Sequence, residues 1–234
     1  MERLKLFEKF CVTNPYDFSE EEFEKVRQDI EHPRKSVVFD EYVDFNLWTR
    51  GLKSRHTYFA DYISEQLPIN KYKKLLEVGC GRNPRVSRLL EQKGYIMTAM
   101  DSVISCEYMM EQKGDIANGD GNEERVRKAS NVTYIKAEFD STKTDISEYD
   151  AIIAQEPCED TEHIVRACVE QKRDFIIALC GVPHVLINGE EPQNVAEWYD
   201  YLEEIGGENG FIINSKMVPG YFCPVMKGFL EGKN

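Results

Sequence analysis

The sequence contains no long apolar run. No stretch of its 234 residues approaches the roughly 20 consecutive apolar residues of a membrane-spanning helix. The first ten residues alternate charged with apolar side chains, so they do not form the apolar region of a secretory signal. Both absences predict a cytoplasmic protein that does not enter a membrane.

The seven cysteines include no CxxC pair, and their number is odd. Disulfide frameworks and zinc ribbons are built from short, paired spacings, so we expect reduced thiols, mostly buried. Basic residues are also in deficit, with 29 Lys and Arg against 42 Asp and Glu, which gives a net charge of −13. This charge disfavours binding to nucleic acids or to anionic membranes, and it favours a small-molecule partner.

What the sequence does contain is a strand–turn–helix segment at residues 75–90. Gly79 and Gly81 lie where the backbone must turn sharply and let a ligand approach closely. The turn leads to the N-terminus of a helix, where a ligand can bind. The apolar positions that predict the buried strand and the helix are Leu75, Leu76, Val78, Val86, Leu89 and Leu90.

From residue 74 onward, short apolar runs alternate with helical patterns. This alternation predicts an α/β domain at residues 71–234 with a doubly wound, mostly parallel seven-stranded sheet. Pro219, Gly220 and Pro224 make the last strand an edge or irregular strand. The predicted strands are 75–78, 96–100, 132–136, 151–154, 175–179, 211–213 and 221–226.

Residues 1–70 have a different pattern, helical and rich in aromatic side chains. Ser19 and Glu22 match the pattern of a capping box, and residues 55–67 have the pattern of a strongly amphipathic helix. We predict an N-terminal helical cap, which either only covers the sheet or also serves as a lid over a ligand.

An acidic residue, Asp101, ends the second predicted strand, twenty residues after Gly81 (101 − 81). A carboxylate at this place can accept hydrogen bonds from both ribose hydroxyls of a nucleoside while the glycine turn receives the rest of the ligand.

With these features the sequence resembles the class I S-adenosylmethionine-dependent methyltransferases. The segment Glu77-Val78-Gly79-Cys80-Gly81 matches the acidic residue and Gly-x-Gly turn of their first motif, and Met100-Asp101 looks like their ribose-binding second motif. The resemblance implies S-adenosylmethionine as cofactor and a methyl-transfer activity. It implies that the cofactor-binding residues are Glu77, Gly79, Cys80, Gly81, Asp101, Ser102, Glu138, Phe139 and Gln155.

Two of these residues follow the third predicted strand. Glu138 falls where the family keeps an acidic residue near the adenine, although Asp140 is a rival for that role, and Phe139 offers the ring an apolar face. Residues 155–158, Gln-Glu-Pro-Cys, occupy the place of acceptor-facing residues. They differ from the Asn/Asp-Pro-Pro-Tyr/Phe box of methyltransferases that act on nucleic-acid bases and glutamine, which favours a small-molecule acceptor.

Methyl transfer depends mainly on positioning and desolvation of the acceptor, with a general base where the acceptor is a hydroxyl or ammonium group. Glu156 is our candidate base or acceptor anchor, although it equally fits an acidic flank of the next helix. His184, on the loop after the fifth strand, is the second catalytic candidate, and His163 reads as a helix-surface residue.

Two other functions use the same fold. A non-catalytic nucleotide-binding protein would share the turn, and an NAD-type oxidoreductase would require glycine where Pro84 stands. Cys80, Cys158 and Cys180 follow neighbouring strands near His184, a set that suits zinc. Because no pair has a short spacing, we prefer small residues packed beneath a ligand and predict no metal.

Overall fold

The computed structural model describes residues 50–104, 131–181, 186–221 and 223–232. The chain divides into two compact units, Met1–Tyr58 and Phe59–Asn234. Most of the predicted N-terminal cap therefore lies outside the described residues, and its boundary at residue 70 stays a prediction. None of the helices within the described ranges is long and apolar enough to cross a membrane.

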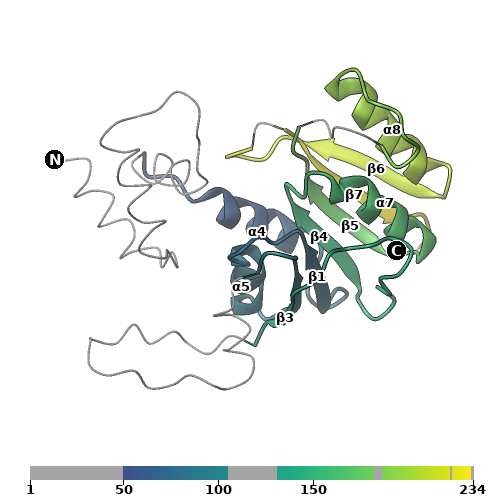
Figure 1. Ribbon diagram of the computed structural model, residues 1–234. Helices are drawn as coiled ribbons and strands as arrows, with labels where there is room; N and C mark the ends of the chain where they lie inside the picture. The colour runs from purple at the N-terminus through teal and green to yellow at the C-terminus, as the bar shows by residue number, and fades with distance from the viewer. Residues whose placement is uncertain (1–49, 105–130, 182–185, 222, 233–234) are drawn as a thin grey trace, which may run out of the picture. The chain divides into compact units, whose positions relative to one another are not determined.

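The second unit is built on one seven-stranded sheet with the order β3-β2-β1-β4-β5-β7-β6 (Figure 1). β1 to β5 are parallel neighbours, and only β7 runs antiparallel to the strands on either side of it. This confirms the predicted doubly wound, mostly parallel sheet. The strands are β1 Lys74–Val78, β2 Ile96–Met100, β3 Thr133–Ile135, β4 Ala151–Gln155, β5 Asp174–Ala178, β6 Phe211–Lys216 and β7 Val225–Leu230.

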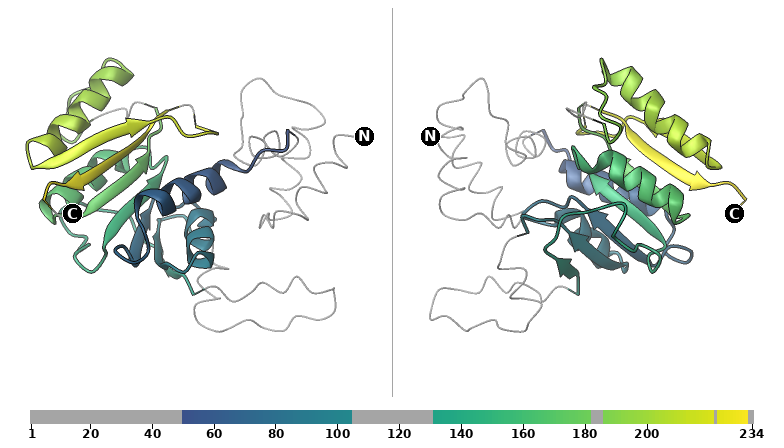
Figure 2. Two further views of the ribbon diagram at one scale, coloured as in Figure 1. Left: turned by 180° about the vertical axis from the view of Figure 1, so that it is seen from behind. Right: turned by 45° about the vertical axis from the view of Figure 1, so that its right-hand side comes forward.

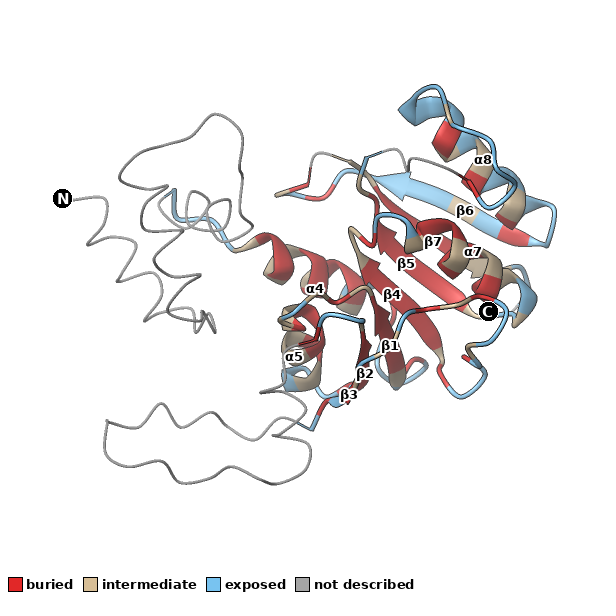
Figure 3. Ribbon diagram, in the orientation of Figure 1, coloured by how far each residue is buried: buried red, intermediate tan, exposed pale blue. Residues whose placement is uncertain are grey.

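Helices cover both faces of the sheet. α4 (Arg55–Gln66) and α5 (Arg85–Gln92) lie on one face, and α7 (Asp160–Glu170) and α8 (Val195–Gly207) lie on the other (Figures 1 and 2). The central strands are therefore buried almost throughout, as the continuous apolar runs of β1, β4 and β5 require (Figure 3). Under α7 and α8 the core includes Ile152, Ile164, Cys168, Phe175, Trp198 and Leu202.

The last strand corrects the sequence interpretation. It spans Val225–Leu230 instead of residues 221–226, and it is an interior strand paired with both β5 and β6. Pro224 precedes the strand, so its missing N–H removes no ladder bond, while its carbonyl still accepts from the Leu179 N–H at 3.1 Å. The edge strand at this end of the sheet is β6, whose residues are mostly solvent-facing.

Candidate ligand site at the carboxyl edge of the sheet

A cavity of about 360 Å³ opens where β1, β2 and β3 end beside the first turns of α7. It brings together five of the nine predicted cofactor-binding residues. The carboxyl ends of parallel strands lie at one edge of the sheet. This explains why Gly79, Asp101 and Glu138 line the same cavity although they are 22 (101 − 79) and 37 (138 − 101) positions apart in the sequence. The lining residues are Gly79, Met100, Asp101, Ser102, Ala137, Glu138, Phe139, Asp160 and His163.

The glycine turn has the conformation that its sequence predicts. Gly79 and Gly81 both have φ of +68°, in the left-handed region that favours glycine. A Cβ atom on Gly79 would lie 3.0 Å from the Cβ of Pro157 and 3.2 Å from its Cα. Gly79 thus lets the turn after β1 and the turn after β4 approach each other, and it leaves bare backbone at the cavity.

Asp101 fastens this turn to the end of β2. One carboxylate oxygen accepts from the Gly81 N–H at 2.8 Å, and the other accepts from the Val103 N–H at 2.9 Å. A carboxylate offers about four lone-pair positions, so both oxygens retain acceptor capacity for hydroxyl donors. Asp101 therefore shapes the turn and also presents acceptors to the cavity that it lines.

Glu77 lies behind the turn and not in the cavity wall. Its side chain is 2% exposed and accepts from the Ser87 N–H at 2.8 Å and from the Ser87 hydroxyl at 2.5 Å. Pro84, at the N-cap of α5, has no side-chain acceptor for these first-turn donors, so Glu77 supplies one. Burial raises the pKa of Glu77 to about 7, although its bonds to Ser87 oppose that shift.

Glu138 and Asp140 differ in their surroundings. Glu138 lines the cavity beside the buried Phe139. The Asp140 carboxylate accepts from the Thr142 N–H at 2.9 Å and pairs with Lys143 at 2.5 Å, and this residue is not part of the cavity wall. Of the two acids, Glu138 therefore lies at the cavity and Asp140 does not.

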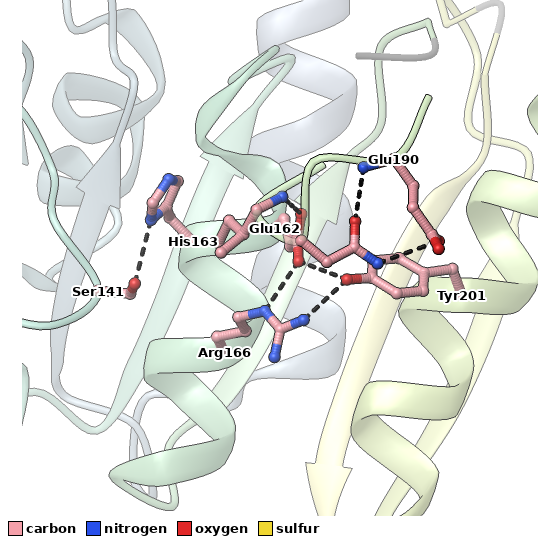
Figure 4. A network of polar contacts seen from close by, with 8 residues as sticks. Ser141, Glu162, His163, Arg166, Glu190 and Tyr201 are labelled. Atoms are coloured by element: carbon pink, nitrogen blue, oxygen red, sulfur yellow. Dashed lines mark hydrogen bonds and ion pairs between the residues drawn. The ribbon is translucent and has the colours of Figure 1, made fainter. Parts of the chain in front are cut away.

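Two cavity residues from α7 were not anticipated from the sequence. Asp160 and His163 are three residues apart in its first turns, so both face the cavity. The Ser141 hydroxyl and His163 Nδ1 lie 3.0 Å apart in a hydrogen bond (Figure 4). Burial, with nearby Asp101, Glu138 and Glu159, raises the pKa of Asp160, and His163 opposes the rise.

One sequence pattern could have indicated these two residues: an acid and a histidine spaced i, i+3 shortly after a predicted strand. Acids in a first helical turn also complement the helix dipole, so the pattern alone does not point to a ligand site. His163 consequently read as a surface residue, whereas it is half-buried in the cavity wall.

The predicted acceptor-facing residues follow β4. Gln155 ends the strand opposite Ala178, and the Glu156 N–H donates to the Ala178 carbonyl at 2.8 Å. Glu156 and Cys158 have φ of +51° and +50°, left-handed values that are strained for side chains other than glycine. Neither Gln155 nor Glu156 lines the cavity. His184 lies outside the described residues.

The thiols do not form a metal site within the described ranges, where no group of three or more His, Cys, Asp or Glu side chains is arranged to hold an ion. The buried Cys80 thiol faces the Gly81 carbonyl, 3.6 Å away, and not the cavity. Burial, reinforced by Glu77 and Asp101, raises the pKa of Cys80 well above its ordinary range, which opposes formation of a thiolate ligand.

The fold is shared with solved methyltransferase structures. The chain is similar to magnesium protoporphyrin IX methyltransferase from Synechocystis with bound S-adenosylmethionine, at 16% identity and a TM-score of 0.50, covering 94% of this chain and 96% of that one. The same enzyme with bound S-adenosylhomocysteine gives 15% identity and a TM-score of 0.51, covering 94% and 99%. At these identities the likeness shows the fold alone. No family model matches the chain, and no curated protein sequence matches it.

Proposed function

We propose that this chain binds S-adenosylmethionine in the cavity at the ends of β1 to β3 and transfers its methyl group to a small-molecule acceptor. The observation that carries the proposal is the convergence of the bare Gly79 turn, the Asp101 carboxylate and the Glu138–Phe139 pair on one cavity. The same fold in structures that hold the methyl donor or its product supports it.

The residues fit the adenosine half of this donor. Asp101 would accept hydrogen bonds from the ribose hydroxyls, since both of its oxygens retain acceptor capacity. Phe139, which is 6% exposed, would pack on the adenine ring. Glu138 or Asp160 would accept from the exocyclic amino group. Glu77 would act as a positioning residue through α5, and it would not touch the donor.

When bound, the donor supplies a sulfonium methyl group that is reactive without covalent help from the protein. The chain's contribution is to orient the acceptor and exclude water from it. We assign the acceptor to the turn after β4, where Gln155 and Glu156 lie beside the Gly79 turn through Pro157. Glu156, and His184, which follows the end of β5 by six positions in the sequence (184 − 178), are the proposed bases for an acceptor that must lose a proton.

Calorimetric titration tests the donor site directly. S-adenosylmethionine and S-adenosylhomocysteine are expected to bind, and NAD is not. Failure of both sulfur compounds to bind at millimolar concentration would contradict the proposal. Product formation with a panel of small acceptors then distinguishes an enzyme from a protein that only binds the nucleotide.

The role of Asp101 has its own test. Asp101→Asn keeps the shape of the side chain but removes its charge, so we expect donor affinity to fall by about 10- to 100-fold, the equivalent of losing a hydrogen bond to a charged group. Asp140→Asn is the matched control, because that carboxylate lies outside the cavity wall. Equal affinities of the two variants would refute the assignment.

A further inference from the structure

Two side chains from the first turns of α7 give the cavity wall a particular hydrogen-bonding pattern. Asp160, when ionised, can only accept, whereas the imidazole of His163 can also donate. Both residues are half-buried, and they lie one helical turn apart on the side of α7 that lines the cavity. Glu138 and Ser102, which also line the cavity, are exposed. Water competes less for hydrogen bonds at the α7 pair, so this pair can discriminate more strongly between ligands.

The hydrogen bond between Ser141 and His163 decides which ring nitrogen carries the hydrogen. The Ser141 hydroxyl lies 3.0 Å from His163 Nδ1, and Ser141 is only 8% exposed. If Nδ1–H donated to this oxygen, the buried hydroxyl hydrogen would have no acceptor within the part of the chain that the structure describes. If the hydroxyl donates to Nδ1 instead, no buried donor is left unpaired. The neutral imidazole then carries its hydrogen on Nε2, on the side of the ring away from Ser141 (Figure 4).

The loop that carries Ser141 is fixed against α7. The Thr144 N–H donates to the Asp140 carbonyl at 2.8 Å, which closes a turn around Ser141. At the other end of α7, Gln171 Nε2 donates to the Thr144 carbonyl at 3.0 Å. The loop after β3 is therefore tied to both ends of the helix, at His163 and at Gln171. These contacts hold the Ser141 hydroxyl in place, so Nε2 is the nitrogen of His163 that remains available to a ligand.

An acceptor next to a donor matches the edge of an adenine base. The 6-amino group of adenine donates, and the ring nitrogens beside it accept. A 6-oxopurine such as hypoxanthine has a carbonyl oxygen in place of the amino group, and that oxygen can only accept. Against the half-buried Asp160 carboxylate, such an oxygen would leave both groups without a donor, which costs free energy.

We propose that Asp160 and His163 select an adenine base over a 6-oxopurine in the cavity. Asp160 accepts from the 6-amino group, His163 Nε2–H donates to a ring nitrogen beside it, and Ser141 is a positioning residue that fixes the imidazole. The inference rests on the proposed function, since it requires that the cavity binds a nucleoside. It goes beyond that function because it assigns the choice of base to α7, and not to the exposed Glu138.

Calorimetric titration of the full-length chain with S-adenosylhomocysteine and S-inosylhomocysteine tests the selection, because the two ligands differ only in the base. We expect a preference of about 100-fold or more for the adenosyl compound. The amide in Asp160→Asn can accept or donate, so the preference should fall by about 10-fold or more. Glu159→Gln is the matched control, since Glu159 is an exposed neighbour outside the cavity wall, and it should keep the preference of the parent.

The donor role of His163 has two further measurements. His163→Phe should lower the affinity for S-adenosylhomocysteine by about 10-fold, whereas His163→Gln, whose amide also offers an N–H, should restore most of it. Nitrogen-15 NMR of the imidazole rings at alkaline pH, without ligand, should show the Nε2–H tautomer for His163. The signal that is missing from His163→Gln identifies it. Ser141→Ala should shift this ring toward a mixture of the two tautomers, which a merely structural role of Ser141 would not do.

The outcomes separate this inference from the proposed function. If the parent binds the adenosyl and inosyl compounds equally well, or if Asp160→Asn keeps the full preference, α7 does not select the base although the nucleoside site stands. An Nδ1–H tautomer of His163 in the parent, or unchanged affinity in His163→Phe, would likewise overturn the inference alone. If the parent binds neither compound at millimolar concentration, the proposed function fails together with it.

Discussion

At the scale of single residues, Glu77 is a motif residue that stabilises the fold and does not line the cavity. Its carboxylate is buried between β1 and the first turn of α5, where two donors from Ser87 face it. Those bonds stabilise the ionised form, but burial outweighs them and raises the pKa of Glu77 from 4.5 to about 7. The folded state therefore binds a proton that the unfolded chain has released between these two pH values.

This shift predicts a particular pH dependence of stability. Because the native pKa is the higher one, the contribution of Glu77 to folding becomes less favourable as pH rises from about 4.5 to about 7, by about 3 kcal/mol in total at 1.36 kcal/mol per pKa unit. Glu77→Gln keeps an acceptor for Ser87 without the buried charge. We expect the variant to be more stable than the parent at pH 8 and to lose that advantage toward pH 5.

Urea unfolding at both pH values measures this difference. Glu203→Gln, at an exposed position on α8, provides the comparison for a simple loss of one negative charge. If Glu77→Gln and Glu203→Gln changed the pH dependence equally, the buried carboxylate would not be its source.

Residue roles could be predicted only in part from the sequence. Asp101 directly follows β2 and Glu138 comes shortly after β3, so the topology alone brings them to one edge, and both line the cavity. Asp160 and His163 depend on how α7 is rotated about its axis, which the packing of its apolar face decides. The contact between Glu77 and Ser87 depends on the path of the turn at Pro84. Such details follow from tertiary packing, which no local pattern encodes.

At the scale of elements, α7 has two polar sides with different tasks. Its first turns present Asp160 and His163 to the cavity. On another side Glu162, 3% exposed, accepts from Arg166 Nε at 2.8 Å, from the Tyr201 hydroxyl at 2.6 Å and from the Ile187 N–H at 2.8 Å (Figure 4). One carboxylate thus connects α7 with α8 and with the segment that leads into α8.

A double-mutant cycle tests this connection. Tyr201→Phe removes the donor to the Glu162 carboxylate and the acceptor of the Arg166 Nη2 bond at 2.7 Å, and it should cost about 1.5–3 kcal/mol of unfolding free energy. Glu162→Ala should cost more, since it leaves three donors without their acceptor. In the Glu162→Ala background, Tyr201→Phe should cost less than in the parent, because the bond to Glu162 is already absent and only the bond from Arg166 remains to be lost. Additive costs in chemical denaturation would contradict a shared network.

Elements differ in how well local sequence defines them. Both ends of each strand from β1 to β5 were predicted to within one residue, because buried parallel strands are continuous apolar runs between turn signals. β7 was placed four residues too early, because Pro224 and Gly220 read as interruptions of a strand that begins only after them. Its interior position could not be inferred, since a proline at the strand entrance looks the same as a proline within an edge strand.

At the scale of the whole molecule, the net charge of −13 and the acids of the cavity wall both make the electrostatic potential at the cavity more negative. The acids in the wall are Asp101, Glu138 and Asp160. The pKa of Asp160 is raised mainly by burial, and the nearby carboxylates Asp101 and Glu138 add to the rise. A negative potential at the cavity attracts cations and repels anions. S-adenosylmethionine carries one net positive charge at neutral pH, whereas S-adenosylhomocysteine carries none, so the two ligands respond differently to this field.

Salt should therefore separate the two ligands. Raising the ionic strength from 0.1 to 1 M shortens the screening length from about 10 Å to about 3 Å, so we expect the donor to lose about threefold or more in affinity while the product changes little. Titrations of both ligands at the two salt concentrations measure this. Asp160→Asn should reduce the difference in salt response between the two ligands. Asp145 is exposed and outside the cavity wall, so Asp145→Asn should leave that difference unchanged. An equal salt response of the two ligands would mean that the acidic surface does not act at the bound sulfonium, and that donor recognition rests on the turn and the adenosine contacts alone.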